Sequence, residues 1–143
     1  MRPYSILFFI LIISSLGRAE GQQGTVAKKK KATPKILYGT ASYYADKFNG
    51  RRTANGEIFS QKKMTAACNV LPLGTWIKVT NLRNGKWVIV KTNDRLHSRM
   101  KRVVDLSTTA ARQLGYYKAG LAKVKVEVLG KKKPVLKSSG GKQ

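Results

Sequence analysis

Residues 75–91 read TWIKVTNLRNGKWVIVK, and this stretch decides the fold class. It opens with an alternating segment, 75–81, and closes with a nearly all-apolar segment, 86–91. Alternation with a period of two is typical of a half-buried strand, and a short apolar run is consistent with a buried one. Asn84-Gly85 lies between the segments and predicts a type I′ turn, in which both central residues take positive φ. The stretch therefore predicts a β-hairpin.

The segments on either side predict more strands and one helix. Residues 122–128 alternate strictly, with alanine and valine on one face, and residues 38–44 are expected to form the first strand. A short helix is predicted over 108–114, because Ser107 can cap its start and Gly115 can end it in the left-handed conformation. Short strands separated by turns, with one or two short helices, predict a mainly β fold, a small closed barrel.

Both ends of the 143-residue chain differ from its centre. Residues 1–19 combine a basic residue, an apolar run and small residues, as a signal peptide does; an uncleaved anchor is the alternative. No cysteine follows the run, so a lipid anchor at a lipobox cysteine is not expected. Residues 20–35 are predicted to be a disordered basic linker and residues 131–143 a disordered basic tail. The expected folded domain is 36–130, exported to the periplasm or cell envelope.

The chain is strongly basic, with 29 lysines and arginines against 6 acidic residues and a net charge of +23. Such a field attracts polyanions, which include nucleic acid, anionic lipid headgroups and cell-wall polymers. The export signal argues against nucleic acid as the partner. The basic arms of a monomer are expected to contact an anionic envelope surface; the alternative is that they are solvated tails without a binding role. One cysteine excludes an intrachain disulfide scaffold, and Cys68 and His97, 29 positions apart, do not make a metal site. No metal or cofactor is expected.

Scarce acidic residues make two carboxyl groups stand out. Glu57 closes the motif TANGE at 53–57, and Asp94 is the centre of NDR at 93–95. Both fall in turn-like contexts at the ends of the central segment, where a side chain can reach a polar substrate. A positioned carboxyl group can donate and accept a proton in turn. The alternatives are a turn-capping Asp94 paired with Arg95, and a Glu57 paired with a lysine.

Eight short motifs occur in order and together resemble the rare lipoprotein A (RlpA) family of bacterial peptidoglycan enzymes. They are GTASYY 39–44, FNGR 48–51, TANGE 53–57, LPLG 71–74, VTNL 79–82, NG 84–85, NDR 93–95 and VDLS 104–107. The resemblance covers roughly residues 39–128 and implies a six-stranded double-psi β-barrel. It also implies lytic transglycosylase activity, which cleaves the MurNAc–GlcNAc bonds of peptide-stripped glycan strands and leaves a 1,6-anhydro end.

The resemblance also implies roles for individual residues, with peptidoglycan glycan strands as the substrate. Asp94 matches the family's catalytic acid/base, and Glu57 matches a second carboxylate that orients the substrate or stabilises positive charge. Substrate contacts are expected from five more residues: Tyr44, Asn55, Cys68, Asn93 and Arg95.

Two positions depart from the family pattern. Cys68 stands where family members commonly have histidine, and a thiol cannot replace imidazole as a cation. It is a tolerated neighbour of the acid, a sign of altered activity, or a small buried hydrophobe. Residues 96–98 are LHS in place of the usual Gly-Pro-Phe, so we expect a reshaped loop. His97 either supplies the missing imidazole from this loop or lies exposed.

Other residues have less specific expectations. Asp105 precedes the helix and is expected to bond backbone N–H groups. Trp76 and Trp87 lie within apolar strands and are expected in the core. The main functional alternative is a non-catalytic, expansin-like module that binds or loosens the wall, and Cys68 keeps it open. A further alternative, a nucleic-acid-binding protein, is supported only by the high positive charge.

Overall fold

The computed structural model describes residues 35–136. The expected signal peptide, nearly all of the basic linker and the last seven residues of the tail lie outside this range. The elements are, in order, β1 (Ile36–Tyr43), η1 (Asp46–Phe48), β2 (Thr65–Ala67), β3 (Trp76–Asn81), β4 (Trp87–Asp94), β5 (Val104–Leu106), α1 (Thr108–Leu114) and β6 (Ala122–Gly130). Within the described range, no helix is long and apolar enough to span a bilayer.

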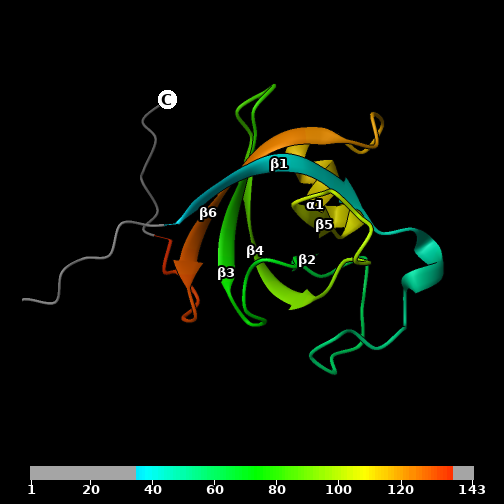
Figure 1. The fold of residues 1–143 in the computed structure, drawn as a ribbon. Helices are drawn as coiled ribbons and strands as arrows, with labels where there is room; N and C mark the ends of the chain where they lie inside the picture. Colours follow the sequence, from blue (N-terminus) through cyan, green and yellow to red (C-terminus); the bar gives the residue numbers. More distant parts are fainter. Residues whose placement is uncertain (1–34, 137–143) are drawn as a thin grey trace, which may run out of the picture. The chain divides into compact units, whose positions relative to one another are not determined.

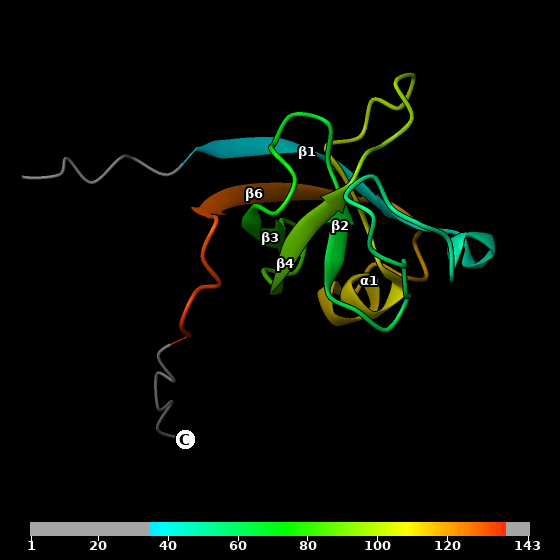
Figure 2. The same cartoon turned by 90° about the horizontal axis from the view of Figure 1, so that it is seen from below.

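The six strands close into a barrel in the order β1-β5-β2-β4-β3-β6 (Figures 1 and 2). β1 runs parallel to β5 and β2 runs parallel to β4, whereas the other neighbours are antiparallel. Parallel neighbours cannot be joined by a tight hairpin, so the chain crosses over between them. The prediction of a mainly β, six-stranded barrel of the double-psi type with short helical pieces is confirmed.

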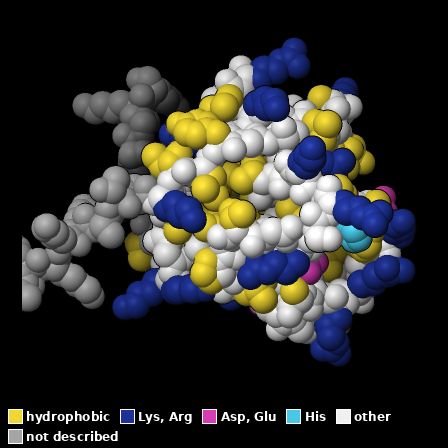
Figure 3. Space-filling view, in the orientation of Figure 1, with side chains coloured by type: hydrophobic (Ala, Val, Ile, Leu, Met, Phe, Trp, Pro, Cys, Tyr) yellow, Lys and Arg dark blue, Asp and Glu magenta, His cyan; other side chains and the backbone are white. Residues whose placement is uncertain are grey.

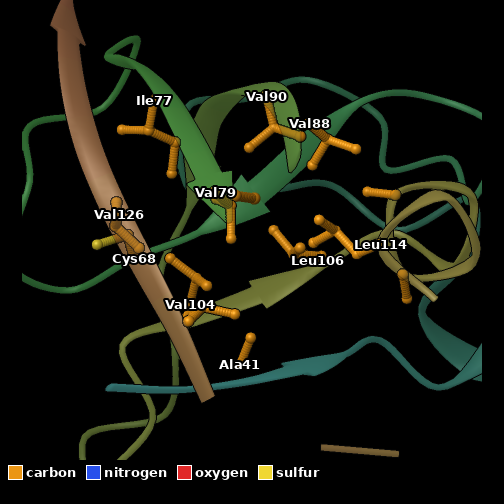
Figure 4. Packing of buried hydrophobic residues seen from close by; sticks show 14 of the residues in the cluster. Ala41, Cys68, Ile77, Val79, Val88, Val90, Val104, Leu106, Leu114 and Val126 are labelled. Atoms are coloured by element: carbon orange, nitrogen blue, oxygen red, sulfur yellow. The ribbon is translucent and has the colours of Figure 1, made fainter. Parts of the chain in front are cut away.

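Aliphatic side chains from all six strands fill the barrel (Figure 4). In β3 the burial alternates strictly, with Ile77 and Val79 fully buried between half-buried neighbours. In β6, Val124 and Val126 are likewise fully buried. The free thiol of Cys68 belongs to the same cluster. The alternating apolar residues of β3 and β6 in the sequence are therefore the residues that point into the core.

The β3–β4 hairpin is present, but the prediction of a type I′ turn is wrong. None of the non-glycine residues in the described range has positive φ, so Asn84 does not adopt the conformation that such a turn requires. Gly85 alone does, at φ 73°, and its N–H donates to the carbonyl of Asn81 at 2.8 Å. Asn84 instead donates its amide to the carbonyl of Leu114 at 2.9 Å. The Asn81 N–H also donates to the carbonyl of Lys86 at 2.8 Å, so the hairpin closes over a longer loop than the two residues that a type I′ turn joins.

The short helix lies where the sequence predicts it, and it packs against β4 and β1. Ser107 has extended backbone, and its Oγ accepts the N–H of Ala110 at 3.3 Å. Gly115 ends the helix in the left-handed conformation at φ 77°. Both capping predictions are confirmed.

The two tryptophans are not in the core, so that prediction is wrong. Trp87 is 48% exposed and Trp76 is half-buried, because the inward positions of their strands are occupied by valine and isoleucine. Lys78 lies 4.7 Å from the centre of the Trp87 ring, and Lys133 lies 5.8 Å from that of Trp76. Figure 3 shows the same basic character more widely, with Lys and Arg across the visible face and only small areas of Asp or Glu.

Candidate functional site

A β-bulge at the end of β4 turns Asp94 away from the barrel interior. Ala66 pairs with Thr92, whereas the next residue of β2 pairs with Asp94. Asn93 is therefore an extra residue on β4. Because side chains alternate along a strand, one extra residue exchanges the faces of all residues that follow it. The bulge places the Asp94 side chain on the outer face of the sheet.

Three donors hold the half-buried carboxylate of Asp94. Its Oδ1 accepts the backbone N–H groups of Ala54 at 2.9 Å and Arg95 at 2.8 Å. Its Oδ2 accepts the hydroxyl of Tyr44 at 2.7 Å. Burial, followed by the hydrogen bond to Asp94, raises the pKa of Tyr44 well above its ordinary value, so the phenol remains a donor at neutral pH. The carboxylate is thus fixed in orientation by groups that do not titrate near neutrality.

Glu57 is held beside this position by two side-chain amides. Its Oε2 accepts from Asn93 Nδ2 at 3.2 Å, and its Oε1 accepts from Asn55 Nδ2 at 2.8 Å. The hydrogen bond from Asn93, then that from Asn55, lower the pKa of Glu57 below its usual range. Partial burial opposes this shift, and the positive charges of Lys91 and Lys63 support it. Glu57 is therefore ionised at neutral pH.

The loop that carries Glu57 is attached to the end of β4. The N–H of Asn55 donates to the carbonyl of Asn93 at 3.2 Å, next to the bond from Ala54 to Asp94. Asn55 Oδ1 also accepts the N–H of Glu57 at 3.1 Å, which closes the turn. Two carboxylates that are 37 positions apart in the sequence are in this way brought to one site.

Arg95 is exposed and donates to backbone carbonyls, whereas the Cys68 side chain is buried. Arg95 Nη1 donates to the carbonyls of Cys68 and Leu71, and the guanidinium thus braces the loop after β2. The Cys68 N–H donates to the carbonyl of Asp94 at 3.1 Å, while the side chain is 0% exposed. The thiol is therefore a small buried hydrophobe and has no direct access to a substrate. His97 lies exposed in the following loop and accepts the N–H of Arg99.

Asp105 has a different environment from the one expected. Its carboxylate accepts the hydroxyl of Ser42, not backbone N–H groups, and Arg102 Nη1 donates to the Ser42 Oγ at 2.7 Å. Burial raises the pKa of Asp105, although the Ser42 bond and the Arg102 charge act in the opposite direction. Ala67 pairs with Asp94 on one side and with Asp105 on the other. In the sequence, the motif VDLS at 104–107 was the feature that could have indicated this second carboxyl group on the outer face.

Replacing Asn93 by alanine is expected to raise the pKa of Glu57 towards its ordinary value, because the strongest cause of the lowered pKa is removed. In the wild type, the stability that Glu57 contributes is present above its unfolded pKa and is lost as pH falls through the lower folded pKa. A carbon-detected NMR titration of the Glu57 carboxyl group measures the shift, and circular dichroism verifies folding.

Asn69→Ala is the matched control, because Asn69 holds the N–H of Leu96 at 2.8 Å rather than a carboxylate. An unchanged Glu57 pKa in a folded Asn93→Ala protein would contradict the assignment.

Three comparisons place the chain among known proteins. Residues 37–126 match the family model described as lytic transglycolase. The endolytic peptidoglycan transglycosylase RlpA of Pseudomonas aeruginosa (strain UCBPP-PA14) is 54% identical over 91 residues, which cover 64% of this chain and 27% of that protein. The protein of the same name from Haemophilus influenzae is 42% identical over 110 residues, 77% of this chain and 38% of that protein. The chain thus spans less than half the length of these relatives.

Solved structures of low sequence identity share the fold. The Streptomyces papain inhibitor superimposes with a TM-score of 0.54 at 20% identity, covering 66% of this chain and 94% of that one. The apo expansin of Clavibacter michiganensis superimposes with a TM-score of 0.53 at 22% identity, covering 71% of this chain and 52% of that one. The chain belongs to the lytic transglycosylase family of double-psi β-barrel domains, the family of the RlpA proteins.

Proposed function

We propose that the chain is an endolytic peptidoglycan transglycosylase that cleaves MurNAc–GlcNAc bonds of peptide-stripped glycan strands. The observation that carries this proposal is the outward-facing carboxylate of Asp94, held by three donors next to Glu57. The names of the relatives support the substrate class.

Asp94 acts as the acid and then as the base. In its protonated form it gives a proton to the glycosidic oxygen, so that the GlcNAc leaves as an alcohol instead of a poorly leaving alkoxide. The resulting carboxylate then takes the proton from the 6-hydroxyl of the MurNAc, and that oxygen bonds to C1. One C–O bond breaks and one forms, without consumption of water. The product carries a 1,6-anhydro end, and Asp94 regains its proton.

Glu57 has the complementary task of stabilising charge. Its lowered pKa keeps it ionised while positive charge develops on the sugar ring, and a fixed anion stabilises that charge. Asn55 and Asn93 hold its two oxygens. Asn55 lies exposed and can also donate to the substrate, whereas Asn93 is 1% exposed and positions Glu57 only. Asn93 Oδ1 has no hydrogen-bond partner among the described residues. Tyr44 positions Asp94 from the other side.

The proposed substrate implies an exported protein. We propose residues 1–19 as the signal peptide, 20–35 as a basic linker, 36–130 as the barrel domain and 131–143 as a basic tail. In this organisation the basic arms contact the anionic envelope surface and the domain works as a monomer.

Digestion of purified, amidase-stripped glycan strands tests the proposal. We expect fragments of intermediate length with 1,6-anhydro ends, which mass spectrometry distinguishes from hydrolysis products by the loss of one water. Reducing ends without anhydro sugars would make the protein a hydrolase. Retained binding without any fragments would favour the non-catalytic wall-binding module.

A further inference from the structure

A hollow lies on the outer surface of the barrel, and neither Asp94 nor Glu57 lines it. It has a volume of about 390 Å³ and is formed by the strands β2, β3 and β4 together with the segment after β6. Its wall combines three lysines with apolar side chains, chiefly Lys63, Lys91, Lys133, Trp76, Ile89 and Pro134. We call this site the Trp76 hollow.

The Trp76 hollow shares a face with Asp94. Lys91 pairs with Trp76 across β3 and β4, so both side chains point to the same side of the sheet. The bulge at Asn93 brings Asp94 to that side as well. Lys91 and Asp94 are three residues apart on one strand, which corresponds to roughly 10 Å. This separation is of the order of one disaccharide repeat.

The hollow also adjoins the Glu57 part of the candidate site. Glu57 accepts from Asn93 Nδ2 at 3.2 Å, and Asn93 follows Lys91 by two residues on β4. The positive charges of Lys91 and Lys63 also support the lowered pKa of Glu57. A glycan strand passing Asp94 and Glu57 therefore meets the Trp76 hollow on the same surface.

The positive charge of the hollow favours binding of an anion. The named wall contains three lysines, and the complete lining has no acidic residue. Among the described residues the one ion pair joins Lys125 and Glu127, so the lysines of the hollow have no carboxylate partner there. The ring of Trp76 adds an apolar surface of the kind on which the C–H faces of a sugar pack.

A sugar with its own carboxylate matches both features. Every MurNAc carries a lactyl group, whose carboxyl is free and charged only after the stem peptide has been removed. In a peptide-bearing strand the same carboxyl is a neutral amide. The chain's own residues 137–143 are poor occupants, because they contain two lysines and no acid.

We propose that the Trp76 hollow binds the free lactyl carboxylate of a MurNAc residue, one repeat away from the bond being cleaved. Lys91 and Lys63 pair with the carboxylate, and Trp76 packs against the sugar ring. The hollow thus selects peptide-free strands. The inference rests on the proposed function, because it assigns a specificity site to that reaction.

The test compares two forms of the same stripped strands, one with free carboxylates and one in which they have been converted to neutral amides. Binding is measured in an Asp94→Asn background, so that cleavage does not interfere, and cleavage is measured with Asp94 intact. We expect Lys91→Gln and Lys63→Gln each to weaken binding to the free-acid strands by about two- to fivefold, as partly exposed ion pairs do. The loss should disappear on amidated strands. Lys86→Gln, at an exposed lysine in the β3–β4 turn, is the matched control and should bind normally.

Trp76→Leu is expected to weaken binding to both forms equally, because the ring contact does not depend on charge. Equal binding of both forms by the wild type, or equal losses of the lysine variants on both, would overturn the proposal. Tighter binding of polyglycerol phosphate, without discrimination between the two glycans, would also overturn it and assign the hollow to a phosphate polymer. Carboxylate-dependent binding without any cleavage product would retain the hollow as a site and reject the proposed reaction.

Discussion

Asp94→Asn is expected to lower the rate of glycan cleavage by roughly 10²- to 10⁴-fold, the usual contribution of a positioned acid or base. Asparagine has the same shape and keeps one oxygen to accept the N–H groups of Ala54 and Arg95. Its amide nitrogen can donate to the Tyr44 hydroxyl, which turns to accept. The variant therefore loses the transferable proton while the surrounding hydrogen bonds remain possible.

The measurement is the initial rate of anhydro-fragment release, with thermal unfolding as the check on folding. Asp46→Asn is the matched control, because Asp46 is an exposed carboxyl group in η1 that accepts from Gln61 at 3.2 Å. It should retain wild-type activity. Undiminished turnover by Asp94→Asn would remove Asp94 from the mechanism.

Leu106→Ala is expected to lower the free energy of unfolding by about 2–5 kcal/mol, the range for large-to-small changes in a packed core. Leu106 is 0% exposed and lies in β5, between β1 and β2. Its carbonyl accepts the N–H of Tyr44 at 3.0 Å, so the core here adjoins the residue that positions Asp94. Barrels without a disulfide depend on such packing.

Urea denaturation followed by tryptophan fluorescence measures this loss. Leu82→Ala is the control, because Leu82 is 52% exposed in the β3–β4 turn and should change stability by no more than about 0.5 kcal/mol. Equal effects of the two substitutions would show that Leu106 does not contribute to the core as described.

The sequence predicted four of the six strands and the helix because their signals are local, whereas β2 and β5, of three residues each, were not predicted. Alternation in 75–81 and 122–128 reports directly which side chains face the core, and Ser107 caps α1 through neighbouring residues. The turn at 84–85 was predicted wrongly because the hairpin closes between Asn81 and Lys86, over a longer loop than a type I′ turn has. The tryptophans were misplaced because their apolar character was weighted above their position in the alternation, which sets Trp76 with Lys78 and Trp87 with Ile89 and Lys91 on the outer face.

The candidate site was predictable in its two carboxylates but not in its surroundings. Asp94 and Glu57 stood out because acidic residues are rare here and their motifs were recognisable. The burial of Cys68 could not be read from its motif, since a buried thiol and an exposed one have the same sequence signal. The bond between Asp105 and Ser42 links β5 to β1, a pairing that only the closed barrel creates.

The single extra residue at Asn93 determines whether the Asp94 side chain points into the barrel or out of it. If the chain were one residue shorter at this point, with the register kept, Asp94 would point inward among valines and leucines. A carboxylate there would lose its hydration without gaining partners, which is costly enough to favour the neutral form or to distort the strand. The number of residues on β4 before the aspartate therefore decides whether its carboxyl group faces solvent, where it can exchange protons, or the closed core, where it cannot.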